Sequence, residues 1–178
     1  MSKRYGRQPT INETLEHFHS NGGGVVVELG SIRQRNNYAG DGYSTVAWAQ
    51  HASVVYTVDI NPKATTLTRE ETAEYDNVIT VTMDGQKFLR AFDGTIDLLY
   101  LDAWDYDTVP DSAEQHLAAY KLAWPKMRAT SLILIDDTDH TDGGKGKLAV
   151  PQAVEDGWKA VFVAKQTLLA RGPAYDMS

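Results

Sequence analysis

Three aspartates stand directly after two of the most apolar runs in the sequence. Asp102 follows the run at 96–101, and Asp136 with Asp137 follows the run at 131–135. If these runs are neighbouring parallel strands about 4.8 Å apart, the three carboxylates converge at one edge of the sheet. Clustered carboxylates repel unless a cation neutralises them, and a set made only of oxygens suits Mg²⁺ or another divalent cation. The sequence therefore predicts a metal site of Asp102, Asp136 and Asp137; the alternative is an Asx-turn with one solvated carboxylate.

A divalent ion at this edge could orient the hydroxyl group of a substrate, here called the acceptor, and lower the pKa of that hydroxyl. Asp102 is therefore a candidate catalytic residue. His140 is a candidate general base by residue type, although an isolated histidine on a loop is also an ordinary surface residue. Trp104 either walls an acceptor pocket or anchors the core. Lys145 and Lys147 could close over an acceptor, but we expect them on a solvated loop.

A second candidate site lies where two earlier apolar runs end. Gly30 closes the run at 25–29, and a glycine there lets backbone approach a ligand closely. Asp59 ends the run at 54–59, where an acid can hold ribose hydroxyls. The residues after Gly30 lack the further glycines of a pyrophosphate-binding turn. An adenosyl cofactor is therefore favoured over a dinucleotide, with helix capping by Glu28 and Asp59 as the alternative.

The elements that must position these residues alternate between strand and helix patterns. A Thr10-x-x-Glu13 capping box predicts the first helix, and Asn61 before Pro62 predicts another that runs to about Tyr75. Further helices are expected from Gly42, over 86–92, from 110 and over 148–155, and strands over 25–29, 54–59, 78–81, 96–101, 131–135, 160–163 and 167–170. The predicted fold class is α/β: a Rossmann-like, doubly wound, mainly parallel seven-stranded sheet with an antiparallel C-terminal hairpin strand.

Length and composition narrow the class of protein. The 178 residues suit one domain, with an N-terminal helix and cap over 1–24 and the Rossmann-like core over 25–171. The absence of cysteine excludes disulfides, zinc-thiolate sites and thiol catalysis. The net charge of -7 counts against a nucleic-acid partner. Neither a signal peptide nor a membrane span is evident, so a cytoplasmic protein without a membrane partner is expected.

Five motifs, taken in order and spacing, carry a specific resemblance. They are Glu28-Leu29-Gly30, Gly42-Tyr43-Ser44, Val58-Asp59-Ile60-Asn61-Pro62, Asp84-Gly85-Gln86 and Leu101-Asp102-Ala103-Trp104. Over about Val25 to Arg171 the chain resembles the class I S-adenosylmethionine-dependent methyltransferases, and most of all the catechol O-methyltransferase-like, metal-dependent enzymes that act on small-molecule hydroxyls. The resemblance implies S-adenosylmethionine and Mg²⁺, or another divalent cation, as cofactors.

The resemblance also implies roles for single residues. Gly30 would pack against the methionine part of the cofactor, and Ser44 would bind its carboxylate. Asp59 would bind the ribose, and Asp84 with Gln86 the adenine end. The other residues that these motifs assign to the cofactor half are Glu28 and Asp102.

Two residues and one loop depart from the family pattern. Asp137 stands where the family has an asparagine, and Asp105 stands where the family's catalytic lysine would follow Trp104. The loop at 31–41 is longer than is usual in the family. The general base and the role of this loop therefore stay open.

The leading expectation is metal-assisted O-methylation of a small molecule, with turnover that a chelator abolishes. The alternative is a methyltransferase-like module that binds cofactor or a partner without catalysis, which the missing lysine favours. Nucleic-acid methylation is a third alternative. The net charge of -7 and the absence of an Asn-Pro-Pro-Tyr exit at Asp102 count against it. The acceptor cannot be read from the sequence, and a homodimer is the default oligomer.

Overall fold

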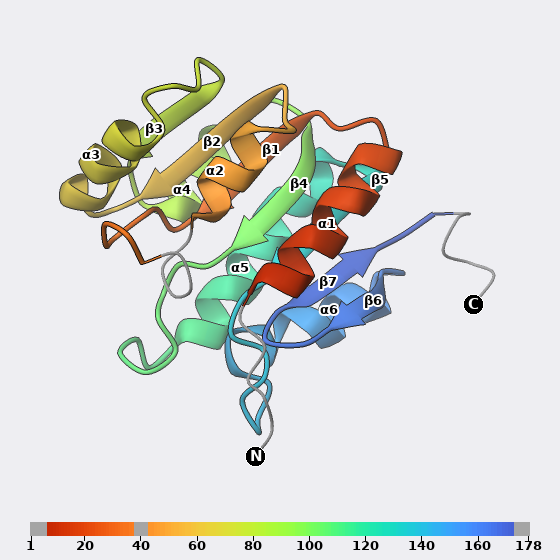
Figure 1. Ribbon diagram of the computed structural model, residues 1–178. Coiled ribbons are helices and arrows are strands. Elements are labelled where there is room, and N and C mark those ends of the chain that lie inside the picture. Colours follow the sequence, from red (N-terminus) through yellow and green to blue (C-terminus); the bar gives the residue numbers. More distant parts are fainter. Residues whose placement is uncertain (1–6, 38–42, 173–178) are drawn as a thin grey trace.

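The fold is a seven-stranded sheet flanked by helices (Figure 1), seen in a computed structural model that describes residues 7–37 and 43–172. Gly42 and residues 38–41 of the long loop lie outside the described residues. The strands are β1 (Val25–Leu29), β2 (Val54–Asp59), β3 (Val78–Thr82), β4 (Ile96–Leu101), β5 (Met127–Ile135), β6 (Lys159–Val163) and β7 (Thr167–Ala170). The α-helices are α1 (Gln8–Ser20), α2 (Ser44–Ala49), α3 (Pro62–Glu71), α4 (Gly85–Ala91), α5 (Ser112–Ala123) and α6 (Ala149–Glu155). Two short 3₁₀ helices are η1 (Trp124–Lys126) and η2 (Gly144–Gly146).

The strand order confirms the predicted topology. The sheet runs β3-β2-β1-β4-β5-β7-β6, with β1 to β5 parallel and β7 antiparallel to both β5 and β6. The order reverses direction between β1 and β4, which carry Gly30 and Asp102 just beyond their carboxyl ends. Open α/β sheets bind ligands at this kind of switch point.

Both faces of the sheet are buried, which explains the continuous apolar runs of its central strands. Helices α1 and α2 cover one face, where Phe18 and Trp48 pack with Val26 and Leu98. Helices α4, α5 and α6 cover the other face. There Leu89 packs with strand residues whose side chains point to that face, such as Val27 and Leu99. In the described parts of the chain, no helix is both long and apolar enough to cross a membrane.

The boundaries of several elements differ from the sequence prediction. Helix α1 begins at Gln8 with Arg7 as its N-cap, so Thr10 lies inside the helix and is buried instead of capping it. Proline in the first turn suits this earlier start, because that position needs no backbone donor. Strand β5 starts at Met127, four residues early, and α3 ends at Glu71. The Asn61 cap of α3 is confirmed, since its side chain accepts a hydrogen bond from the backbone N–H of Lys63.

Gly30 is required by a backbone contact, independently of any ligand. Its φ is +104°, and a Cβ at this position would lie 2.6 Å from the carbonyl oxygen of Asp102. The close approach that the sequence predicted for a cofactor is thus also an approach of the β1 exit to the β4 exit. A side chain at Gly30 would push apart the two loops that form the switch point.

Replacing Gly30 with alanine should therefore lower the free energy of unfolding by about 3 kcal/mol, from a strained positive φ together with the overlap with backbone. Urea denaturation measures the change. Gly157→Ala is the matched control, because Gly157 has a φ of +90° but no atom lies within 4 Å of the place that a Cβ would take. It should cost only about 1 kcal/mol. Equal costs at the two positions would show that the contact with Asp102 is unimportant.

Candidate functional site

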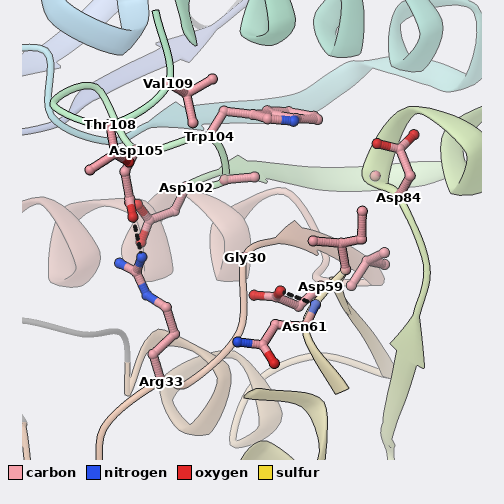
Figure 2. Close-up of a pocket in the computed structure, with 14 residues that line it drawn as sticks. Gly30, Arg33, Asp59, Asn61, Asp84, Asp102, Trp104, Asp105, Thr108 and Val109 are labelled. Atoms are coloured by element: carbon pink, nitrogen blue, oxygen red, sulfur yellow. Dashed lines mark hydrogen bonds and ion pairs between the residues drawn. The ribbon is translucent and has the colours of Figure 1, made fainter. Parts of the chain in front are cut away.

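A cavity of about 280 Å³ opens at the switch point of the sheet. Its lining comes from the segments that follow four strands, β1, β2, β3 and β4 (Figure 2). The lining residues are Gly30, Arg33, Val58, Asp59, Ile60, Asn61, Asp84, Gly85, Asp102, Ala103, Trp104, Asp105, Thr108 and Val109. The predicted residues Gly30, Asp59, Asp84, Asp102 and Trp104 are thus brought together around one cavity.

Asp59 is held rigidly at the cavity. Its Oδ2 accepts a hydrogen bond from the backbone N–H of Ser31 at 3.1 Å, and its Oδ1 accepts one from that of Asn61 at 2.8 Å. A carboxylate has about four acceptor positions, so each oxygen keeps capacity for a ligand hydroxyl. The loops after β1 and β2 therefore orient an acceptor pair that suits a ribose.

Asp84 and Gln86 lie differently from each other. Asp84 lines the cavity and also caps α4, accepting a hydrogen bond from the backbone N–H of Lys87. The Gln86 amide donates instead to Gln115 Oε1 at 2.6 Å, on helix α5, and Gln86 is not among the lining residues. Of the two residues predicted at the adenine end of the cofactor, Asp84 therefore lines the cavity and Gln86 does not.

Glu28 and Ser44 contact each other beneath the cavity and do not line it. Glu28 is buried and accepts hydrogen bonds from Ser44 Oγ at 2.6 Å, Thr45 Oγ1 at 2.5 Å and Trp48 Nε1 at 3.2 Å. Burial raises the pKa of Glu28 to about 7, against the lowering effect of its hydroxyl partners. In this arrangement Glu28 ties the first turn of α2 to strand β1.

A pH dependence follows from Glu28. Its folded-state pKa of about 7 lies above its ordinary value of 4.5, so the folded protein binds more protons than the unfolded chain between these values. Stability from this group is therefore present at low pH and is lost as pH rises towards 7, by on the order of 3 kcal/mol. Glu28→Gln should remove this loss, measured as the difference from wild type in urea midpoints across pH 4.5–7.5. The exposed Glu74, replaced by glutamine, should give the wild-type profile.

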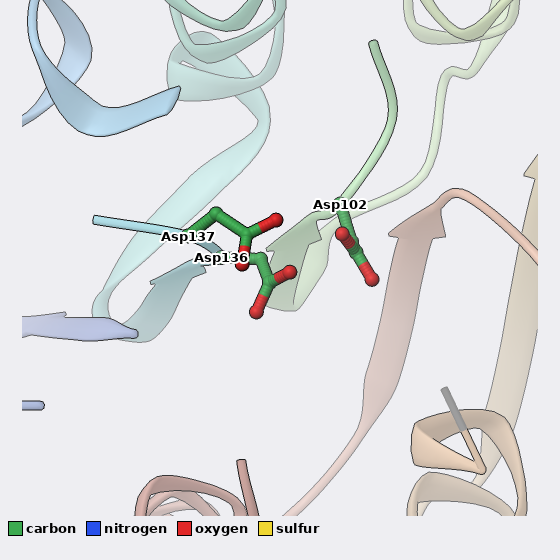
Figure 3. Close-up of side chains that lie close together, drawn as sticks. All are labelled: Asp102, Asp136 and Asp137. Atoms are coloured by element: carbon green, nitrogen blue, oxygen red, sulfur yellow. The ribbon is translucent and has the colours of Figure 1, made fainter. Parts of the chain in front are cut away.

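The three aspartates at the exits of β4 and β5 do converge, as Figure 3 shows. One carboxylate oxygen from each of Asp102, Asp136 and Asp137 lies within 4.8 Å of the others. Asp137 has a φ of +46°, an uncommon conformation for a residue with a side chain. The parallel arrangement of β4 and β5 thus produces the acidic cluster that the sequence predicted.

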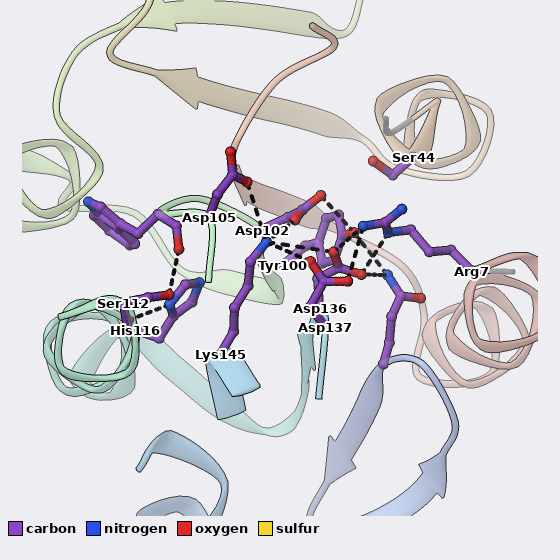
Figure 4. Close-up of polar contacts among 12 residues, drawn as sticks. Arg7, Ser44, Tyr100, Asp102, Asp105, Ser112, His116, Asp136, Asp137 and Lys145 are labelled. Carbon is purple, nitrogen blue, oxygen red and sulfur yellow. Dashed lines mark hydrogen bonds and ion pairs between the residues drawn. The ribbon is translucent and has the colours of Figure 1, made fainter. Parts of the chain in front are cut away.

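Lys145 reaches into the middle of this cluster (Figure 4), contrary to the expectation of a solvated loop. Its Nζ lies 2.6 Å from Asp102 Oδ1, 3.3 Å from Asp137 Oδ2 and 3.7 Å from Asp136 Oδ2. The side chain is 1% exposed. Burial lowers the pKa of Lys145, but the three carboxylates outweigh that effect and hold the pKa above its usual value. The ammonium is therefore charged.

Two further cations complete the cluster. Arg7 binds Asp136 through two nitrogens, at 2.7 and 2.5 Å, and reaches Asp137 at 3.4 Å. Lys165 Nζ lies 2.6 Å from Asp137 Oδ1. Among the described residues, three cations therefore face three carboxylates.

Neutral groups bind the same carboxylates. Gln166 donates to Asp136 Oδ1 at 2.9 Å, and the hydroxyl of Tyr100 donates to Asp102 Oδ2 at 3.2 Å. Asp105, at the position of the family's lysine, pairs with Arg33 across the mouth of the cavity (Figure 2). The three carboxylates of the cluster and that of Asp105 are thus engaged within the protein.

Trp104 lines the cavity, and His116 packs against the Trp104 ring without itself lining the cavity. Trp104 has a φ of +46°, and its ring meets the His116 ring edge-on with centroids 5.3 Å apart. His116 is buried, and its Nδ1 donates to the carbonyl oxygen of Ser112 at 2.7 Å because a carbonyl can only accept. Its Nε2 has no hydrogen-bond partner among the described residues, and burial lowers the pKa of His116 to about 4. His116 is therefore neutral, with a free acceptor nitrogen.

Sequence reasoning named His140 and did not consider His116. Neither histidine lines the cavity, but His116 contacts the ring of Trp104, which does. His140 stacks on Tyr106 with ring centroids 4.3 Å apart and does not line the cavity. The signal for His116 was its position one helical turn before Tyr120, on the buried face of α5. Arg7 and Lys165 had no local signal, because each reaches the cluster from a segment distant from Asp102.

Comparison with known proteins agrees with this geometry. A family model described as a methyltransferase domain matches residues 39–138, a stretch that includes Asp59, Asp102, Asp136 and Asp137. The chain belongs to this methyltransferase domain family. No curated protein matches the sequence. The strand order, the helices on both faces and the cavity at the switch point are those of a class I S-adenosylmethionine-dependent methyltransferase.

Solved structures share the fold at low sequence identity. The N-methyltransferase NodS of Bradyrhizobium japonicum superposes with a TM-score of 0.66 at 14% identity, covering 94% of this chain and 97% of that one. An rRNA methylase from Streptococcus thermophilus gives 0.65 at 12%, covering 97% and 99%. The methyltransferase PaMTH1 of Podospora anserina, bound to S-adenosylhomocysteine, gives 0.65 at 18%, covering 97% and 80%. Neighbours with different acceptors share this fold, so the fold leaves the acceptor open.

Proposed function

We propose that this S-adenosylmethionine-dependent methyltransferase methylates a hydroxyl group of a small molecule. The observation that carries the proposal is that Asp59 and Asp102 line the same cavity, one at the exit of β2 and the other at the exit of β4. Asp59 offers paired acceptors for a ribose, and Asp102 offers an acceptor for the hydrogen of an incoming hydroxyl. The resemblance of the exit motifs to catechol O-methyltransferase-like enzymes supports the same assignment.

The cofactor would lie along the carboxyl ends of β1 to β3. Asp59 would hold the ribose hydroxyls, Gly30 would approach the methionine part, and Asp84 would lie near the adenine. Ile60, which is 72% exposed at the cavity, offers an apolar surface for the adenine ring. Glu28 would not contact the cofactor; by accepting from Ser44 it would hold the first turn of α2 in place.

The transfer itself is a substitution at the methyl carbon. The acceptor oxygen forms a bond to the methyl group while the bond from that carbon to the cofactor sulfur breaks, which turns the sulfonium into a neutral thioether. The hydroxyl proton passes to the carboxylate of Asp102 as the new bond forms. Trp104 would hold the acceptor against the methyl group, since its ring lines the cavity beside Asp102.

The sequence also predicted a divalent metal held by Asp102, Asp136 and Asp137. The spacing of the three carboxylates suits a metal. However, the position between them is taken by the Lys145 ammonium, and Asp136 is bound through two nitrogens of Arg7. As arranged, these residues do not fit a divalent ion, and no step of the proposed reaction uses one.

A nucleic-acid acceptor is disfavoured by the charge of the cavity. Among the described residues, four that line the cavity are aspartates, and the one lining cation, Arg33, is paired with Asp105. Phosphates would be repelled from this mouth, whereas a neutral or cationic small molecule would not. Small-molecule acceptors are therefore the class to screen.

The experiment is a two-stage assay. First, S-adenosylmethionine should raise the melting temperature of the protein, with ATP and NAD as cofactor controls that should not. Second, formation of S-adenosylhomocysteine should be followed with a panel of small hydroxyl compounds, matched amines and a short RNA. Product only with amines or RNA would contradict the proposal, and so would the absence of any shift with S-adenosylmethionine.

A further inference from the structure

We propose that the ammonium of Lys145 is the resident cation of the acidic cluster, standing where a divalent metal would otherwise bind, so that the cluster positions Asp102 without metal. The part of this inference that concerns the role of Asp102 rests on the proposed function. The other part, that Lys145 excludes divalent ions from the cluster, does not depend on the identity of the acceptor.

The distances place the Lys145 ammonium inside the cluster and not beside it. Its Nζ is within 4.0 Å of a carboxylate oxygen from each of Asp102, Asp136, Asp137 and Asp105, with the shortest contact, 2.6 Å, to Asp102. A point charge with three donors satisfies several carboxylates at once, as a small metal ion does. Because the Lys145 side chain is 1% exposed, water contributes almost nothing to solvating its ammonium, which depends on these carboxylates instead.

The backbone of the loop is built to deliver this side chain. The backbone N–H of Lys145 donates to the carbonyl oxygen of Asp137 at 3.3 Å. Gly144 packs so closely on the same carbonyl that a Cβ there would overlap it, and its φ is +51°. Short helix η2 thus presses against the exit of β5, and Lys145 has a fixed starting point for its path to Asp102.

The balance of charge in the cluster also disfavours metal binding, because protein cations already neutralise its three carboxylates. Arg7 and Lys165 already neutralise Asp136 and Asp137, which leaves Lys145 to neutralise Asp102. A divalent ion would have to expel a buried ammonium and would face two more cations. If the ammonium stayed buried after a metal took its partners, it would be a desolvated and unpaired charge, at a large cost.

The consequence for function concerns Asp102, which alone of the three acids lines the cavity. Lys145 binds Asp102 Oδ1, and Tyr100 donates to Oδ2. These two contacts fix the plane of the carboxylate that faces the acceptor. Lys145 is therefore a positioning residue for Asp102, while it does not itself line the cavity.

The test is a titration with MnCl₂, followed by the loss of the electron paramagnetic resonance signal of free Mn²⁺. Wild-type protein should bind Mn²⁺ only weakly, with a dissociation constant in the millimolar range or above that the titration bounds from below. Lys145→Met, which keeps an unbranched side chain but removes the charge, should bind Mn²⁺ on the order of a hundredfold more tightly. Lys147→Met is the matched control, because Lys147 is on the same loop but is 52% exposed and pairs with Asp142. It should behave as wild type.

Two results would overturn the inference. One is wild-type protein that binds Mn²⁺ as tightly as Lys145→Met does. The other is a folded Lys145→Met protein that binds no more Mn²⁺ than wild type. Lys145→Gln carries the same prediction with a side chain that can still donate to Asp102, in case the methionine variant does not fold. The wild-type titration needs no variant.

The assay also separates this inference from the proposed function. If no acceptor is methylated but the Mn²⁺ results are as expected, the acceptor class is wrong and the resident cation stands. If methylation of a hydroxyl is found and EDTA abolishes it, the proposed function stands and the resident cation is wrong. Turnover that persists in EDTA supports both.

Discussion

Replacing Asp59 with alanine should weaken the binding of S-adenosylmethionine by about a hundredfold or more, because two charge-assisted hydrogen bonds to the ribose would be lost. In thermal-shift titration the variant should show no rise in melting temperature at cofactor concentrations that saturate wild type. Isothermal titration calorimetry gives the change in dissociation constant directly. This is the largest effect on cofactor binding that we expect from a single substitution in the chain.

The design must separate loss of a ligand contact from loss of local structure, because Asp59 also accepts from the backbone of Ser31 and Asn61. Asp59→Asn keeps one acceptor oxygen and should show an intermediate loss of affinity. The exposed Asp93, replaced by alanine, should bind cofactor as wild type does. Unaltered cofactor affinity in a folded Asp59→Ala protein would remove the ribose assignment.

The second large effect is expected on turnover. Asp102→Asn should lower kcat by about a hundred- to a thousandfold, because the acceptor proton loses its carboxylate. The dissociation constant for S-adenosylmethionine should change by only a few fold, since in the proposed arrangement Asp102 contacts the acceptor and Asp59 holds the ribose. Single-turnover measurement with saturating cofactor separates the two quantities.

Asp105 offers a matched control for this substitution. It lines the same cavity and lies near Lys145, but it pairs with Arg33 at the mouth and is 39% exposed. Asp105→Asn should therefore lower kcat by less than about tenfold, because partly exposed ion pairs contribute little. If Asp102→Asn and Asp105→Asn fall together, the loss reflects the charge of the cavity and not proton transfer at Asp102.

His140→Ala bears on the alternative candidate for the general base. His140 stacks on Tyr106 away from the cavity lining, so its loss should leave kcat near the wild-type value. A large fall in kcat with unchanged cofactor binding would show that His140 takes part in catalysis.

Much of this protein was determined by local sequence patterns. Apolar runs followed by an acid or a glycine predicted four of the five parallel strands and their exits, because strands buried on both faces need continuous apolar residues. The edge strand β3 was predicted from its β-branched residues instead. Parallel strands deliver their carboxyl ends to one edge, so the meeting of Asp102 with Asp136 and Asp137 followed from the order of the strands alone. The positions of Gly30, Asp59 and Asp84 at the cavity followed for the same reason.

What fills the space between those exits was decided by tertiary structure. Lys145, Arg7 and Lys165 are long, flexible side chains whose charged ends lie several bonds from their backbones, so no local pattern states where they point. Arg7 reaches Asp136 across 129 positions of sequence. The sequence determined where the acids meet. Only the packing of α1, the η2 loop and the turn between β6 and β7 against that edge decided that protein cations neutralise them.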